Sequence, residues 1–189
     1  MGKKYKLLKD DSIVHEGKTL YRIQAVRDIV NLAGQVMVSK GELGGYIEGE
    51  RNLGQTGLSW IYNNGKVYDQ ARVYGDAVVS DYAEVYDYAK VYGKTRIYGN
   101  AKVYGYTEVY GDAKVRGYAE VYGDAKVYGD AEVYGDAKVY DYAKVYDYAK
   151  VYESARISGY AEIYGYAKVY HGTWVRYHDK IYGDNEVVR

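Results

Sequence analysis

Apolar and polar residues alternate in a six-residue phrase over most of the chain. Between residues 57 and 182 the sequence divides into 21 hexads without an insertion, as in "GDAKVY". The third position is Ala in 15 hexads, the fifth is Val or Ile in all 21, and the sixth is Tyr in 17. Positions three to six therefore alternate between small or branched apolar residues and charged residues or Tyr, which is the period of a β-strand.

The first two positions of each hexad predict a tight corner. The first position is Gly in 12 hexads, and most of the others carry Asp or Asn, which also adopt positive φ. A four-residue strand with a two-residue corner is too short for hairpins that share one core. The pattern therefore predicts an all-β fold, a single-stranded parallel β-solenoid in which equivalent residues stack about 4.8 Å apart. Ala and Val fill its interior, and Tyr, Lys and Glu face outward.

Charges at the fourth position bear on the size of one coil. At a spacing of three hexads, 11 pairs have opposite sign and 5 have the same sign; at two hexads the numbers are 5 and 10. Stacked neighbours of opposite sign stabilise a sheet, which favours three-sided 18-residue coils. Two-sided 12-residue coils remain the alternative, because the Lys/Glu alternation and most fifth-position Ile residues repeat every second hexad.

Both ends depart from the repeat. Residues 1–56 are not periodic, and we expect them to form a capping segment that covers the strand edges of the first coil. Residues 57–182 form the predicted solenoid, and residues 183–189 form an end strand. Near that end Asp179 occupies an inward position. Because a lone buried carboxylate is costly, we expect the coil to open there.

The repeat resembles the hexapeptide repeat of left-handed parallel β-helix proteins, in which an aliphatic residue is often followed by Gly or Asp and a small residue lies two places before the next aliphatic. All hexads from 57 to 182 fit that pattern, and the segment "GELGGYIEGERNLGQTGLSWIYNNGKVY" resembles the start of YdcK-like proteins of bacteria and prophages. The resemblance implies left-handed coils but brings no settled activity. Many hexapeptide β-helices are trimeric acyltransferases with a catalytic His beside an inserted loop. Here no loop interrupts the hexads, and no residue matches that base.

Composition narrows the class of function. The chain has 26 basic and 26 acidic residues, which argues against nucleic acid or an acidic membrane as partner. It contains no Cys, so disulfides and thiolate metal sites are excluded, and we expect no cofactor. No apolar run is long enough for a membrane helix or a signal peptide. A cytoplasmic protein, or one released with a host cell or phage, is the expectation.

Tyrosine is the residue that most needs an explanation, with 29 copies and no Phe. At a spacing of three hexads the longest unbroken tyrosine column, a candidate binding ladder, consists of Tyr74, Tyr92, Tyr110, Tyr128, Tyr146, Tyr164 and Tyr182. Stacked rings can stabilise the rod, or the column can present an aromatic surface to a glycan or to another rod. A homodimer through the C-terminal end or through a Tyr face is expected.

Other candidate chemistry is sparse. The corner residues Asp76, Asp112, Asp124, Asp130 and Asp136 lack calcium-site spacing and are expected to bond to their own turns. His171 and His178 lie in the last coil without an acidic partner at the spacing of a metal or triad site. The sequence therefore predicts no catalytic residue and no metal ligand. We interpret the chain as a non-enzymatic structural or interaction module, with glycan binding and acyl transfer as alternatives.

Overall fold

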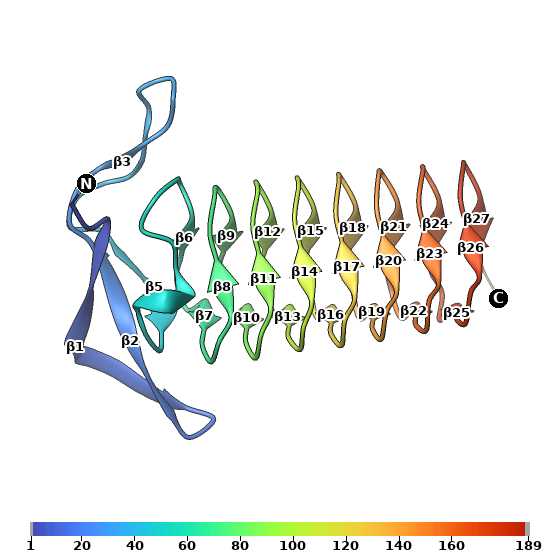
Figure 1. Ribbon diagram of the computed structural model, residues 1–189, viewed down its shortest axis with the longest axis horizontal. Coiled ribbons are helices and arrows are strands. Elements are labelled where there is room, and N and C mark those ends of the chain that lie inside the picture. The colour runs from blue at the N-terminus through green and yellow to red at the C-terminus, as the bar shows by residue number, and fades with distance from the viewer. Residues whose placement is uncertain (1, 188–189) are drawn as a thin grey trace.

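The computed structural model describes residues 2–187, which form a rod of stacked coils with a hairpin across its N-terminal end (Figure 1). The described chain is all-β apart from one short 3₁₀ helix. The N-terminal segment contains β1 (Tyr5–His15), β2 (Lys18–Ala25), β3 (Ile29–Val30), β4 (Val36–Val38), β5 (Leu43–Ile47) and η1 (Glu50–Asn52).

Two-residue strands form the three sides of the rod, each side a parallel sheet. The first side contains β7 (Lys66–Val67), β10 (Glu84–Val85), β13 (Lys102–Val103), β16 (Glu120–Val121), β19 (Lys138–Val139), β22 (Arg156–Ile157) and β25 (Trp174–Val175). The second contains β8 (Arg72–Val73), β11 (Lys90–Val91), β14 (Glu108–Val109), β17 (Lys126–Val127), β20 (Lys144–Val145), β23 (Glu162–Ile163) and β26 (Lys180–Ile181). The third contains β6 (Trp60–Ile61), β9 (Val78–Val79), β12 (Arg96–Ile97), β15 (Lys114–Val115), β18 (Glu132–Val133), β21 (Lys150–Val151), β24 (Lys168–Val169) and β27 (Glu186–Val187).

Strand pairing confirms the coil of three hexads. Lys126 pairs with Lys144 and Val127 with Val145, and every other parallel step from β6 onward has the same spacing. The alternative of two hexads is wrong. Two hexads would make a flattened coil, whereas three hexads enclose a triangular space that Ala and Val side chains fill.

The interior consists of the third and fifth hexad positions, as predicted. Ala125 and Val127, for example, are fully buried. Thr95, Thr107 and Thr173 replace Ala in the same layer and are also buried. Their hydroxyls donate to the carbonyls of Tyr92, Tyr104 and Tyr170 at 2.7, 2.7 and 2.6 Å, so the substitution leaves no unsatisfied polar group.

The corners have the positive φ that the sequence predicts. Gly93 has φ +75°, and a Cβ at that position would lie 2.7 Å from the carbonyl oxygen of Gly111 one coil away. Asp takes the same conformation at several corners, including Asp81 and Asp147 with φ 60° and 57°. Its short side chain is one of the few that tolerates the left-handed region.

The N-terminal segment changes from antiparallel to parallel pairing before the first hexad. Strands β1, β2 and β5 pair antiparallel, and β5 then pairs parallel with β7. Parallel pairing therefore begins at Tyr46, whose partner is Lys66, and Leu53 likewise bridges Val73. By this numbering the first coil is two residues longer than the coils that follow it.

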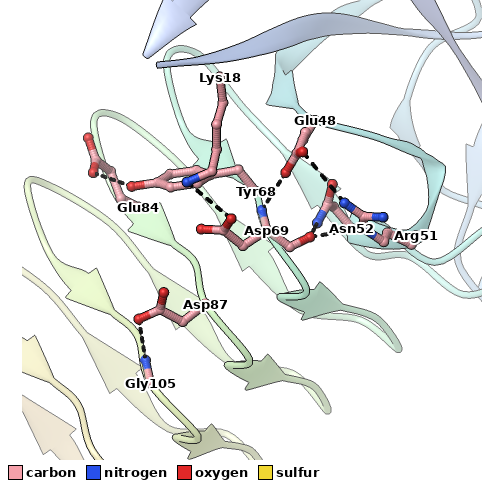
Figure 2. A network of polar contacts seen from close by, with 9 residues as sticks. All are labelled: Lys18, Glu48, Arg51, Asn52, Tyr68, Asp69, Glu84, Asp87 and Gly105. Atoms are coloured by element: carbon pink, nitrogen blue, oxygen red, sulfur yellow. Dashed lines mark hydrogen bonds and ion pairs between the residues drawn. The ribbon is translucent and has the colours of Figure 1, made fainter. Parts of the chain in front are cut away.

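Polar contacts fix the N-terminal hairpin to the side of the rod (Figure 2). Lys18 lies 3.1 Å from the carboxylate of Asp69, and the Asp69 N–H donates to Glu48 at 2.7 Å. Tyr5 closes the end of the core, because it is fully buried and its ring lies edge-on to Trp60 with 6.4 Å between centroids.

The expectation that the coil opens at Asp179 is wrong. Glu162 N–H donates to Asp179 O at 2.9 Å, and β26 and β27 pair with β23 and β24 in the regular register. The Asp179 side chain is exposed because no further coil lies over it among the described residues. An inward carboxylate in this last coil is therefore hydrated rather than buried.

Candidate functional site

The predicted tyrosine column forms one continuous stack of rings on the second side of the rod. From Tyr74 to Tyr164 consecutive centroids lie 4.9–5.0 Å apart with planes within 8° of parallel. Tyr164 and Tyr182 complete it at 5.4 Å and 17°. All seven candidate residues therefore belong to one array, which we call the long ladder.

Shorter ladders occupy the other two sides. On the first side Tyr68, Tyr86, Tyr104, Tyr122 and Tyr140 stack at 4.8–5.1 Å, and the edge of His15 contacts Tyr68. On the third side Tyr134, Tyr152 and Tyr170 stack at 4.9 and 4.8 Å. Ser80 and Arg116 flank Tyr98 in its column, so Tyr98 has no stacked ring among the described residues.

A second set of ring stacks, not predicted from the sequence, lies at the corners. Tyr88 stacks on Tyr106 at 4.8 Å, Tyr148 on Tyr166 at 5.0 Å, and Tyr142 on Tyr160 at 5.0 Å, followed by His178 at 5.1 Å. The sequence does contain a pattern that predicts these stacks, because tyrosines at the second hexad position recur at a spacing of three hexads. These corner rings are more exposed than the interior rings of the long ladder, with Tyr106 at 63%.

At an interior position of a ladder both flat faces of the ring are covered, so this part of the rod presents ring edges and hydroxyl groups. Burial, with the nearby carboxylates of Glu108 and Glu162 as a smaller cause, raises the pKa of Tyr92 and Tyr146 to about 12. The hydroxyls stay protonated and act as hydrogen-bond donors. An interior position of a ladder therefore cannot stack a ligand on a ring face.

Lysine and glutamate side chains pair between coils, beside the tyrosine hydroxyls. Eight Lys–Glu pairs join residues on neighbouring coils, including Lys90–Glu108 at 3.2 Å and Lys144–Glu162 at 3.4 Å. Burial would raise the pKa of Glu108, but the ammonium groups of Lys90 and Lys126 outweigh it and hold this pKa below its usual value. The paired charges form a regular surface lattice.

Aspartates at the first hexad position bond to the neighbouring coil. Asp87 accepts from Gly105 N–H at 3.2 Å (Figure 2), and Asp147 accepts from Gly165 N–H at 3.2 Å. The backbone N–H of the first hexad position takes no part in strand pairing. The Asp carboxylate of the preceding coil accepts a hydrogen bond from it. Five second-position aspartates were expected to bond to their own turns. For Asp76 this expectation is wrong, because its carboxylate accepts from Leu58 N–H at 3.1 Å, one coil earlier.

The structure does not bring the histidines together. His15 Nε2 lies 3.2 Å from Glu84 Oε1 in the hairpin contact, His171 pairs with Glu153, and His178 stacks on Tyr160. Residues 2–187 contain no group of three or more His, Asp or Glu side chains that fits a metal ion. They also contain no helix with the length and hydropathy of a membrane span.

Lys4 is the amine with the most perturbed pKa. Burial, together with repulsion from Arg27, lowers the pKa of this amine to about 8. Such an amine would be a nucleophile candidate on an accessible surface. Lys4 is fully buried and donates to the Ser59 carbonyl at 2.7 Å, so it anchors the N-terminal segment to the core instead.

Comparison with known proteins identifies no family for this chain. The chain matches no protein-family model, and a search of the curated proteins finds no match. The parallel solenoid is therefore established from the pairing of the strands, and the left-handed hexapeptide-repeat relationship stays a proposal.

Proposed function

We propose that this protein is a non-enzymatic β-solenoid rod with a structural or interaction role, in which stacked tyrosines stabilise the coils. The observation that supports this proposal best is the unbroken three-hexad register from β6 to β27, which no inserted loop interrupts. Enzyme sites require several polar groups that converge in a cavity, and insertions between coils are the usual way for a solenoid to build one.

The finer part of this proposal is kinship with left-handed hexapeptide-repeat proteins of the YdcK-like group. Its support is the hexad itself, with Val or Ile at every fifth position and Gly or Asp at most corners. Acyl transfer is the competing function for that class. His171 and His178 support it poorly, because His171 pairs with Glu153 and His178 is one ring of a corner stack.

Two measurements on the full chain test the proposal. We expect purified protein to give no transfer from acetyl-coenzyme A to amine or hydroxyl acceptors, and we expect X-ray scattering in solution to report a rod. Turnover that His171→Gln abolishes, with Lys94→Gln as a control of unchanged fold, would replace the proposal by the acyltransferase alternative.

We also propose that two copies of this chain associate through the last described coil. Each coil donates backbone N–H groups forward, as Glu162 does to Asp179 O at 2.9 Å. The equivalent N–H groups of Trp174 and Lys180 have no acceptor among residues 2–187. Open strand edges of this kind favour pairing with another chain.

Sedimentation distinguishes this end contact from contact through a Tyr face. Lys180→Pro removes one of the open donors, whereas the double change Tyr142→Ser with Tyr160→Ser removes an exposed ring stack. We expect the first to abolish the dimer and the second to preserve it. The reverse result would assign the contact to the Tyr face, and a monomeric native chain would refute self-association.

A further inference from the structure

The long ladder stops at Tyr74 because the coil before it offers a glycine in that column. The first coil is two residues longer, so Gly54 rather than residue 56 occupies the position equivalent to Tyr74. Two contacts establish this register: Leu53 bridges Val73, and Gly54 N–H donates to Val73 O at 2.8 Å.

One flat face of the Tyr74 ring is therefore not covered by another ring. Tyr92 covers the opposite face, with 5.0 Å between centroids and 8° between planes. Tyr74 is 37% exposed, whereas the five following rings are half-buried. At this end the ladder offers what its interior positions lack, a ring face that a ligand can stack on.

The open ring borders a groove between the N-terminal segment and the second side of the rod. The groove has a volume of about 450 Å³, and Arg51, Leu53, Gln55, Arg72, Tyr74 and Lys90 line it. That volume is typical of small-ligand sites. Lys4 N–H donates to Gln55 Oε1 at 2.8 Å, which orients the Gln55 amide, and the Gln55 NH₂ group has no partner among the described residues.

The charge beside this ring is unbalanced. Arg72 and Lys90 are direct register partners of the same sign, which costs stability in a sheet. Where Lys126 and Lys144 meet in the same column, each has its own glutamate at 3.4 Å. Lys90 pairs with Glu108, but Arg72 has no acidic partner among residues 2–187. An anion between Arg72 and Lys90 would relieve the repulsion.

We propose that this groove binds a carboxylated sugar residue, such as a uronic acid of an acidic glycan. The apolar face of the sugar ring packs on Tyr74, and its carboxylate lies between Arg72 and Lys90. Hydroxyl groups of the sugar meet the polar rim, where Glu50 and Arg51 offer an acceptor and a donor. A sugar fits this rim better than a flat aromatic anion, which has no hydroxyls for it.

The site does not depend on the proposed structural role. The sequence-based hypothesis was that a glycan binds along the surface of the long ladder. The present proposal assigns binding to the N-terminal end of that ladder, where one ring face is open. A rod without this activity and a rod with it would scatter X-rays identically, so the two proposals fail independently.

The test is calorimetric titration of the full chain with glucuronate, with glucose and benzoate as comparison ligands. We expect binding of glucuronate at one site per chain, weaker binding of glucose, and weakening of glucuronate binding at high salt. Tyr74→Leu and Arg72→Gln should each weaken binding about tenfold. Two matched controls should leave it unchanged: Tyr110→Leu, inside the long ladder, and Arg96→Gln, on the third side of the rod.

Three results would overturn the proposal. These are no heat with glucuronate, equal losses in Tyr74→Leu and Tyr110→Leu, and stronger binding of benzoate than of glucuronate. Circular dichroism of each variant shows whether the fold is kept. If Tyr74→Leu disturbs the fold, the comparison of Arg72→Gln with Arg96→Gln decides alone.

Discussion

The ring of Tyr146 lies parallel to the ring of Tyr128, with 4.9 Å between centroids and 1° between planes. This contact repeats what the backbone does, because Lys144 and Val145 pair with Lys126 and Val127 one coil earlier. The Ala/Val interior is narrow and offers each coil little apolar area. Ring stacking outside the sheet adds contact between coils, and it requires the same three-hexad register as the core.

Adjacent valines on one strand test which face is the interior. Val79 is fully buried, and its neighbour Val78 points outward and is half-buried. Val79→Ala should lower the free energy of unfolding by about 2–3 kcal/mol through lost transfer and a cavity. Val78→Ala should cost less than about 1 kcal/mol in the same urea titration. Equal costs would contradict the assignment of the two faces.

Two tyrosines at the same hexad position test the contribution of stacking. Tyr128 has a ring on each side, whereas Tyr98 has none among the described residues. Tyr128→Leu removes two ring pairs and should destabilise the rod by about 1–3 kcal/mol. Tyr98→Leu should cost clearly less. If chemical denaturation gives the same loss for both, the ladders contribute nothing beyond burial.

Alkali should unfold the rod in a defined range of pH. Burial raises the pKa of Tyr92 from the ordinary 10.0 to about 12, so the folded chain holds protons that the unfolded chain releases. The stabilisation that comes from this raised pKa is fully present below pH 10 and is lost as the pH rises from about 10 to about 12. Unfolding midpoints and phenolate absorbance, measured together, check it. Tyrosine ionisation well below the unfolding transition would be inconsistent with it.

Acid should weaken the lattice of paired charges. Although burial acts in the opposite direction, Lys144 and Lys180 hold the pKa of Glu162 below its usual value of 4.5. The contribution of these pairs is present above that value and is lost as the pH falls through the folded pKa. Glu162→Gln should therefore reduce the acid dependence of the unfolding midpoint. An unchanged acid dependence would show that the pairs are energetically silent, as many exposed pairs are.

A corner aspartate and its amide analogue separate backbone strain from the charged hydrogen bond. Asp147 has φ 57°, and its carboxylate accepts from Gly165 N–H at 3.2 Å. Asp147→Ala should cost about 1–2 kcal/mol, because Ala in the left-handed region is strained and the donor loses its partner. Asp147→Asn, which tolerates that region, should cost less. Asp130→Ala, at an exposed corner position, is the control.

The periodic part of the fold followed from sequence because every coil solves the same packing problem. Val at each fifth position identified the interior, and Lys–Glu pairs such as Lys90–Glu108 distinguished three hexads per coil from two. Column positions then placed the long ladder from Tyr74 to Tyr182. A comparison of second hexad positions at the same spacing of three hexads also predicts the corner stacks, such as Tyr88 on Tyr106.

The N-terminal groove did not follow from sequence, because it depends on a break in the period. The two additional residues between Leu53 and Trp60 place Gly54 over Tyr74, and only the pairing of Leu53 with Val73 shows this. Asp179 was misjudged for a related reason. The hexad position predicts that the Asp179 side chain points inward. It does not show that no further coil covers this side chain among the described residues.

Pairwise cross-linking tests the central claim most directly, since the chain has no native Cys. Lys126 and Lys144 lie side by side on neighbouring coils and face outward, at the separation that a disulfide spans. Lys126→Cys combined with Lys144→Cys should form an intramolecular disulfide rapidly under mild oxidation. Lys126→Cys combined with Lys138→Cys, only two hexads apart, should not. Cross-linking of the second pair in preference to the first would contradict the three-sided coil and the surface built on it.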